Sequence, residues 1–160
     1  MSLTVRSLAE HEDPEAALVE YHRVDAVAFG SAPDPAHLEV KRPLVEPDRW
    51  YLAGLDGDAC GGVGSFPFEL TLPGGATMAA SGVSDVGVLP THRRRGVLRS
   101  LMARQLDDLA QRGDVAAVLH ASEAGIYRRF GFGPATRWRH VEIDARRASF
   151  VPWWPDPGGR

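Results

Sequence analysis

The chain has 160 residues, a net charge of −3, 44% hydrophobic residues and 24% charged residues. This length suits one domain with a substantial core. The acidic balance argues against a nucleic-acid-binding protein, which usually carries a basic excess, and no apolar run approaches the roughly 18 residues that a membrane-spanning helix needs.

The single cysteine, Cys60, cannot form an internal disulfide, so the sequence fits a reducing compartment. The first residues lack the basic-then-apolar order of a signal peptide. We therefore expect a cytoplasmic protein, with Cys60 buried and unreactive. Neither the histidines nor this cysteine have the spacing of metal ligands, so we predict no metal site.

The first half of the chain predicts a strand, two helices and a hairpin. Residues 3–8 alternate between apolar and polar and indicate a strand. Asp13 followed by Pro14 is typical of a helix start, and Gly30 of a helix end. Asp34 and Pro35 repeat this start signal for a shorter helix. From residue 49 the period becomes two, and the sequence DGD at 56–58 predicts a hairpin turn.

The second half predicts a further strand, a helix and more strand and helix segments. Residues 76–90 read as a strand with interior glycines at 82 and 87, which often mark a bulge or a close approach. Residues 97–112 have helical periodicity, 115–121 read as a buried strand, and 122–131 as a short helix capped by Ser122. Residues 136–145 alternate again and predict a last strand. The order indicates a mixed α/β fold.

Four arginines surround one glycine between the predicted strand at 76–90 and the long helix, in the sequence THRRRGVLRS at 91–100. A helix start offers backbone N–H groups and a partial positive charge to an anion, Gly96 permits close approach, and arginines bind phosphate oxygens. Three explanations compete: a nucleic-acid patch, a solvated surface turn, and a cradle for a small anionic ligand such as a diphosphate.

Two further features favour the cradle. Gly87 lies between two valines in the preceding strand, whose backbone there is available to an extended ligand that contains amides. Tyr127 lies on a short helix just after a buried strand, and a ligand can enter where two parallel strands part.

The blocks VSDVGVLPTHRRRGVLRSLM and LHASEAGIYRRFGFGPAT, spanning about residues 83–136, resemble the GNAT superfamily of acetyl-CoA-dependent N-acetyltransferases. Within it they look most similar to the N-terminal unit of the enhanced-intracellular-survival (Eis) proteins. The resemblance implies a mixed, mostly antiparallel sheet flanked by helices, with a V-shaped splay between two parallel central strands. It also implies transfer of an acetyl group from acetyl-CoA to a primary amine of a small molecule or a peptide.

The resemblance also implies roles for individual residues. Tyr127 matches a tyrosine that acts as general acid and protonates the departing thiolate. The matching cofactor-binding positions fall on the strand end, the arginine turn and the wall beyond the buried strand: Val86, Gly87, Val88, Arg94, Arg95, Gly96, Val97, Leu98, Arg99, Ser122 and Glu123.

Two departures from the Eis pattern stand out. Eis-like chains continue into further domains and use their terminal carboxylate as a base, whereas this chain shows one domain over residues 1–148 and an irregular tail over 149–160. We therefore expect either a piece of a longer protein or a different base. Asp85 stands where the family has an apolar residue facing the substrate, so it is expected to alter specificity, unless the faces of that strand differ from the predicted ones.

Other polar residues have both functional and ordinary explanations. Asp25 and Glu20 fit either an amine-binding pocket or a solvated helix face, and Glu123 either a base or a cap partner. His120 fits a proton shuttle, although a hydrogen-bonded core histidine is commoner. Trp153 and Trp154 suggest an interface, either between copies of the chain or with a further domain.

Overall, the sequence predicts an acetyltransferase. A non-catalytic acyl-CoA-binding module remains the alternative, since no base is identified.

Overall fold

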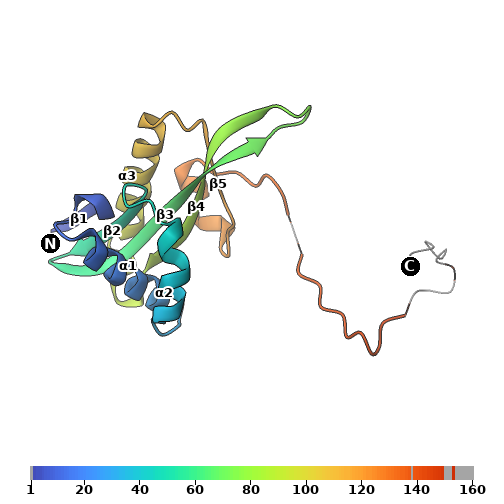
Figure 1. Cartoon of the computed structure of the whole chain (residues 1–160), viewed down its shortest axis with the longest axis horizontal. Coiled ribbons are helices and arrows are strands. Elements are labelled where there is room, and N and C mark those ends of the chain that lie inside the picture. Colours follow the sequence, from blue (N-terminus) through green and yellow to red (C-terminus); the bar gives the residue numbers. More distant parts are fainter. Residues whose placement is uncertain (1, 138, 150–152, 154–160) are drawn as a thin grey trace.

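A computed structural model describes residues 2–137, 139–149 and 153. Five strands form one sheet in the order β1-β2-β3-β4-β5: Leu3–Ser7, Trp50–Leu55, Asp58–Thr71, Thr77–Val88 and Ala116–Leu119. All neighbouring pairs are antiparallel except β4 and β5, which are parallel. The predicted mixed, mostly antiparallel fold is confirmed (Figure 1).

The helices begin where the sequence predicts. Helix α1 spans Pro14–Ala28, and the Asp13 carboxylate accepts hydrogen bonds from the amides of residues 15 and 16. Helix α2 spans Pro35–Lys41 with Asp34 as its cap, and α3 spans Val97–Gln111. No helix among the described residues has the length and apolar character needed to cross a bilayer.

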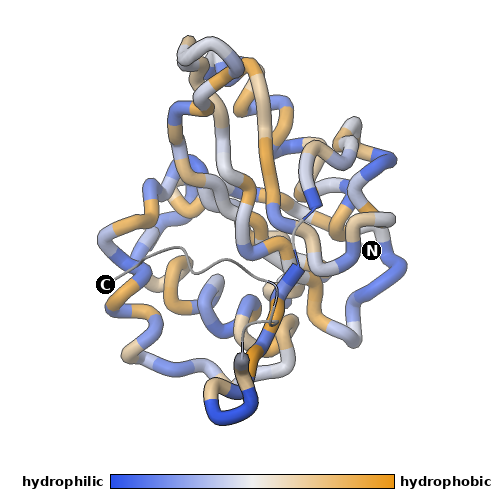
Figure 2. Tube along the Cα trace, turned by 90° about the vertical axis from the view of Figure 1, so that its right-hand side faces the viewer, coloured by the Kyte–Doolittle hydropathy of each residue, from blue (hydrophilic) through white to orange (hydrophobic). Residues whose placement is uncertain are grey.

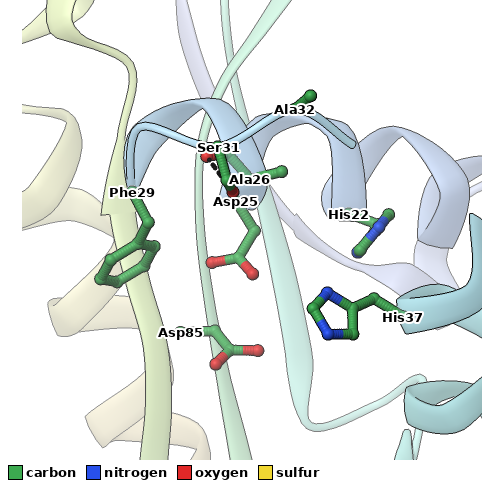
Figure 3. A pocket seen from close by; sticks show the side chains of 8 residues that line it. All are labelled: His22, Asp25, Ala26, Phe29, Ser31, Ala32, His37 and Asp85. Carbon is green, nitrogen blue, oxygen red and sulfur yellow. Dashed lines mark hydrogen bonds between the residues drawn. The ribbon is translucent and has the colours of Figure 1, made fainter. Parts of the chain in front are cut away.

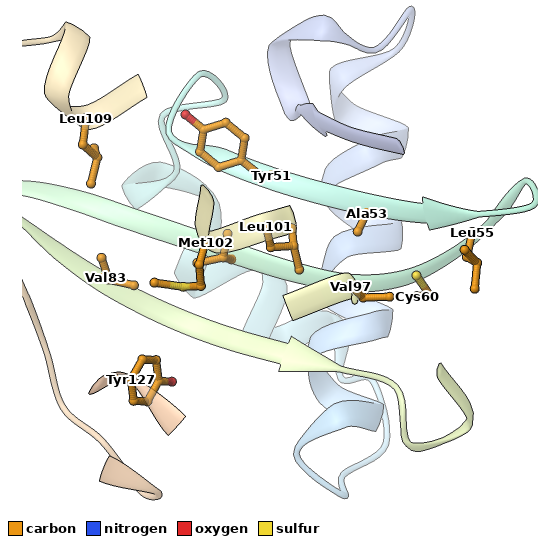
Figure 4. Close-up of a cluster of buried hydrophobic side chains, with 11 residues drawn as sticks. Tyr51, Ala53, Leu55, Cys60, Val83, Val97, Leu101, Met102, Leu109 and Tyr127 are labelled. Carbon is orange, nitrogen blue, oxygen red and sulfur yellow. The ribbon is translucent and has the colours of Figure 1, made fainter. Parts of the chain in front are cut away.

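The helices cover opposite faces of the sheet, and each face has its own core. Helix α3 contributes Leu101, Met102 and Leu109 to one cluster (Figure 4). Helix α1 contributes Leu18, Tyr21 and Val24 to the other. Hydrophobic and hydrophilic residues are interspersed along the trace (Figure 2), and β2 and the middle of β3 are buried on both faces because a helix covers each side.

Two glycines of β3 let aromatic rings lie directly on its backbone. A Cβ atom added at Gly62 would collide with the ring of Tyr21, and one added at Gly64 would collide with the indole of Trp50. The two rings meet edge to face, with centroids 5.2 Å apart. Helix α1 is therefore closely interlocked with the middle of the sheet.

Helix α1 also approaches β4. A Cβ added at Gly87 would lie 2.9 Å from the Cβ of Ala28, so this interior glycine does mark a close approach. The bulge in β4 lies nearby: Gly62 pairs with Gly87 and Gly64 with Ser84, which leaves Asp85 and Val86 opposite Val63. Asp85 has a φ of 52°, a left-handed conformation that Asp tolerates better than most residues.

The pairing of β4 and β5 is short. It runs only from Ala80 with Ala116 to Val83 with Leu119, so among the described residues the last five of β4 have no strand partner on that side. This end of the pairing is where the family resemblance implies a splay, although β5 lies at the edge of the described sheet and not at its centre.

Two local predictions are wrong. The described residues of 136–145 form no strand; they run away from the sheet, and Val141 and Ile143 are 70% and 69% exposed (Figure 1). An alternating pattern becomes a strand only when a neighbour pairs with it, and none does here. The short helix predicted after residue 122 is instead two 3₁₀ turns, Ala124–Ile126 and Arg128–Phe130, which end at Gly131 as expected.

Ser122 does not cap these turns. Glu123 occupies the cap position and makes no side-chain cap hydrogen bond. The predicted tail at 149–160 lies almost wholly outside the described residues, as does Trp154, while Trp153 is exposed.

Candidate functional site

The turn between β4 and α3 presents free backbone donors. Gly96 precedes the helix with a φ of 85°, and no side chain caps this end. The first hydrogen bond within the helix runs from the amide of Ser100 to the carbonyl of Gly96, at 3.1 Å. The amides of Val97, Leu98 and Arg99 therefore have no partner inside the helix, which is the arrangement that binds anions at helix starts.

The arginines of this turn point outward. Arg93, Arg94, Arg95 and Arg99 are all exposed, and none of them forms an ion pair with any described residue. Arg94 has a φ of 63°, so the turn holds two left-handed residues, one of them not glycine. Free amides and unpaired guanidinium groups together suit a ligand with several negative charges, and a diphosphate fits this description.

The apolar members of the candidate site share one core. Val86, Val88 and Leu98 pack against the cluster to which Val97 and Tyr127 belong. Val97 is 1% exposed, so its side chain belongs to the core. The fold thus brings the end of β4, the start of α3 and Tyr127 together, although they are separated by up to 41 residues in sequence.

Tyr127 is nearly buried, at 8% exposure, and its ring packs edge to face on Phe132 with centroids 5.9 Å apart. In Figure 4 its hydroxyl points toward the carboxyl end of β4. Burial, and secondarily the charge of Glu123, raise the pKa of Tyr127. The phenol therefore keeps its proton at neutral pH and can donate it.

Residues beyond β5 differ in how they relate to this cluster. Ser122 and Glu123 are exposed on the connection that leads from β5 to Tyr127. His120 is also exposed, so its interpretation as a core histidine is wrong.

Cys60 is fully buried, as predicted, and burial raises the pKa of its thiol.

A second group of polar residues lies on the α1 side of β4. A pocket of about 280 Å³ is lined by Asp25, Asp85, His22, His37 and Phe29, among others. Figure 3 shows the two carboxylates approaching each other from α1 and β4. Asp25 and Asp85 were singled out from the sequence, whereas His37 and Phe29 were not, because no local pattern connects them to the strand.

Lys41 also belongs to this group, and no sequence pattern indicates it. Its Nζ lies 3.4 Å from Oδ2 of Asp25 and contacts Oδ2 of Asp85. It also lies 4.8 Å from the ring centroid of Trp50 and 5.2 Å from that of Tyr21. Residues 16 and 44 positions apart thus meet around one ammonium group.

Comparisons with known proteins identify relatives of this chain. An uncharacterized N-acetyltransferase of Streptomyces coelicolor is 52% identical over 126 residues, covering 75% of this chain and 30% of that protein. N-acetyltransferase Eis of Mycobacterium tuberculosis is 36% identical over 154 residues, covering 94% and 37%. The chain thus spans about a third of the length of these relatives.

Solved structures show the same fold. The crystal structure of Eis1 from Mycobacterium abscessus superposes with a TM-score of 0.64 at 41% identity, covering 82% of this chain and 31% of that one. The structure of AAC(6')-Iy in complex with the bisubstrate analog CoA-S-monomethyl-acetylneamine has a TM-score of 0.69 at 18% identity, covering 90% and 99%. Residues 11–135 match the family described as acetyltransferase (GNAT) domain, and the chain therefore belongs to that family.

Proposed function

We propose that this domain transfers an acetyl group from acetyl-CoA to a primary amine on a small cationic molecule or a peptide. The observation that carries the proposal is the uncapped start of α3, where three amides have no partner inside the helix and four exposed arginines form no ion pair with a described residue. The fold and family relatives supply the reaction class; the residues below supply the mechanism.

The candidate site fits coenzyme A in two ways. The amides of Val97, Leu98 and Arg99, with Arg94 and Arg95 beside them, would hold the diphosphate. The unpaired edge of β4 at Val86–Val88 would hydrogen-bond the amides of the pantetheine arm, as an added strand does. When bound, the cofactor supplies an acetyl group as a thioester.

The exposed residues at the far wall complete this arrangement. Ser122 and Glu123 follow β5 and would border the cofactor on the side opposite to β4. Tyr127, nearly buried and protonated, would donate its proton to the leaving thiolate. Backbone N–H groups on the unpaired part of β4 would stabilise the negative charge that develops on the carbonyl oxygen.

The acceptor amine would enter from the other side of β4. The pocket with Asp25 and Asp85 lies there, and its carboxylates favour a cationic molecule. The small volume and acidic lining of this pocket favour a small polyamine over a large partner. The single buried thiol of Cys60 suits a reducing compartment, so we place this reaction in the cytoplasm.

One variant separates catalysis from mere binding. Tyr127→Phe removes the proton donor and keeps the ring, so we expect kcat to fall about 100- to 10,000-fold. Calorimetry with acetyl-CoA should give the same affinity as for the wild-type chain. Full turnover in this variant would refute the acid role.

The wild-type chain itself tests the larger claim. Binding of acetyl-CoA without transfer to any amine would favour a non-catalytic acyl-CoA-binding module. Absence of binding at tens of micromolar cofactor would remove both functions.

A further inference from the structure

The pocket on the α1 side of β4 brings two carboxylates into one small space. Asp25 projects from α1, Asp85 from the bulge of β4, and Figure 3 shows their oxygens facing each other. Their side chains are only 17% and 24% exposed. Two like charges this close repel each other unless a cation or a proton relieves them.

Lys41 relieves part of this repulsion from behind. Its ammonium group contacts Oδ2 of both aspartates and lies over the buried rings of Tyr21 and Trp50. Lys41 does not line the pocket itself. One positive charge against two negative charges leaves one negative charge for the pocket.

The other oxygen of Asp25 carries that excess. Its Oδ1 is buried, and among the described residues it has no hydrogen-bond partner. Burial, and secondarily the charge of Asp85, raise the pKa of Asp25, while Lys41 and His22 act against them. A desolvated carboxylate oxygen without a donor is stabilised by taking up a proton.

Other ionisable groups surround the pair. On α1, Nε2 of His22 lies 2.9 Å from the carbonyl oxygen of Asp34, and the hydroxyl of Tyr21 donates to the carbonyl oxygen of Asp85. From α2, His37 lines the pocket. Among the described residues, Lys41 is the cation that forms ion pairs with the two aspartates, so the pocket has room for the charge of a further cationic molecule.

The pair also lies beside the place where the acetyl group would be held. Asp85 immediately precedes Val86–Val88, and Oδ1 of Asp25 lies 4.0 Å from the position that a Cβ of Gly87 would occupy. No other carboxylate lines this pocket. Asp85 of the pair thus adjoins the unpaired edge of β4 on the same strand.

We propose that the Asp25–Asp85 pair, supported by Lys41, is the proton acceptor for the amine in this domain. The inference rests on the proposed function. The amine nitrogen attacks the thioester carbon, a C–N bond forms and the C–S bond breaks. The proton lost by the nitrogen goes to the pair, and the departing thiolate takes its proton from Tyr127, so the products are an amide and a free thiol.

Three substitutions test this role, and two of them should shift the pH profile in opposite directions. Asp25→Asn removes the acceptor, and kcat/KM for 1,5-diaminopentane at neutral pH should fall about 100-fold or more. Lys41→Met removes a cation, so the acidic limb of the profile of kcat/KM against pH should move about one unit toward higher pH. Asp85→Asn removes an anion, so this limb should move by a similar amount toward lower pH. Asn also tolerates the left-handed backbone at position 85.

Matched controls lie on α1 and directly after α2, outside the pocket. Glu20→Gln neutralises a carboxylate of α1 that pairs with Arg23, and Arg42→Met removes a cation next to Lys41 that pairs with Glu15 and Glu39. Both should leave the pH profile unchanged. A limb that stays in place in Lys41→Met and Asp85→Asn, or an active Asp25→Asn, overturns the inference.

A readout without turnover keeps the inference separate from the proposed function. Carbon-13 NMR of labelled aspartates, assigned with Asp25→Asn, should show the Asp25 carboxyl titrating above the ordinary range. Its midpoint should rise in Lys41→Met and fall in Asp85→Asn. If the wild-type chain transfers no acetyl group, the proposed function fails; a midpoint that ignores both substitutions rejects the pair whatever the transfer assay gives.

Discussion

The arginines of the turn at 93–99 are exposed and form no ion pair with a described residue, whereas Arg49, Arg104 and Arg112 each pair with an aspartate. The second group lies where helices and strands meet: Arg104 links α3 to Glu10, and Arg112 links the end of α3 to Asp48. An arginine whose charge is already satisfied serves the fold, while one left unpaired at a helix start is available to a ligand. Whether an arginine has an ion-pair partner thus indicates its role better than the number of arginines does.

The largest effect should come from Arg49. Its side chain is 11% exposed and hydrogen-bonds Asp114 and Ser81, both at 3.1 Å. Arg49→Met leaves Asp114 buried without its cation, and the free energy of unfolding should fall by about 3 kcal/mol. Urea denaturation measures this change, and a loss below about 1 kcal/mol would show that the pair is not structural.

Arg95→Gln should weaken ligand binding and leave stability nearly unchanged, the reverse of what we expect for Arg49→Met. We expect its affinity for acetyl-CoA to fall about 10- to 100-fold, because a charge-assisted hydrogen bond to a phosphate is lost. The free energy of unfolding should stay within about 0.5 kcal/mol of the wild type. Arg112→Gln is the control, with unchanged affinity; equal loss of affinity in both variants would erase the distinction between the two groups.

Acidification should reduce the folding stability that comes from the paired arginines, not from the exposed arginines of the turn. A hydrogen bond from Arg112 lowers the pKa of Asp48, and one from Arg104 lowers that of Glu10. A lowered pKa in the folded state stabilises above the pKa of the unfolded chain, about 4, and this stability is lost as the pH falls through the folded value.

Each of these exposed pairs should contribute less than about 1 kcal/mol. Denaturation between pH 6 and about pH 3 should therefore show a shallower decline in Arg112→Gln than in the wild type. A steeper decline in the variant would contradict the assignment.

The smallest effect should come from Arg23, which pairs with Glu20 at 2.7 Å on the exposed face of α1. Arg23→Gln should cost about 0.3 kcal/mol, near the limit of thermal denaturation measurements. A loss above about 1 kcal/mol would mean that exposure does not separate the strong pairs from the weak ones.

The sequence reveals the local parts of this domain well. The caps at Asp13 and Asp34, the hairpin at 56–58 and the helix after Gly96 all follow from residue types at short spacing, and all are found in the structure. The arginine turn is local in the same sense. Its backbone geometry depends on a glycine and a helix start that adjoin each other in the chain.

The parts of the structure that depend on long-range pairing do not follow from the sequence pattern. The alternating pattern at 136–145 contains no information about whether a neighbouring strand will pair with it. Lys41 joins Asp25 and Asp85 only because α2 folds back over α1 and β4. No pattern within 16 or 44 residues of sequence predicts such a meeting, so the charge balance of the pocket became visible only in three dimensions.

The bare backbone at Gly62 and Gly64 has a consequence for how this domain can diversify. Aromatic rings from α1 and β2 occupy the space of two missing side chains, so any sliding of α1 along the sheet would drive a ring into the main chain. The lining of the pocket can therefore change through individual side chains, or through the connection from α1 to α2, while the position of α1 stays fixed for as long as Tyr21 lies on Gly62.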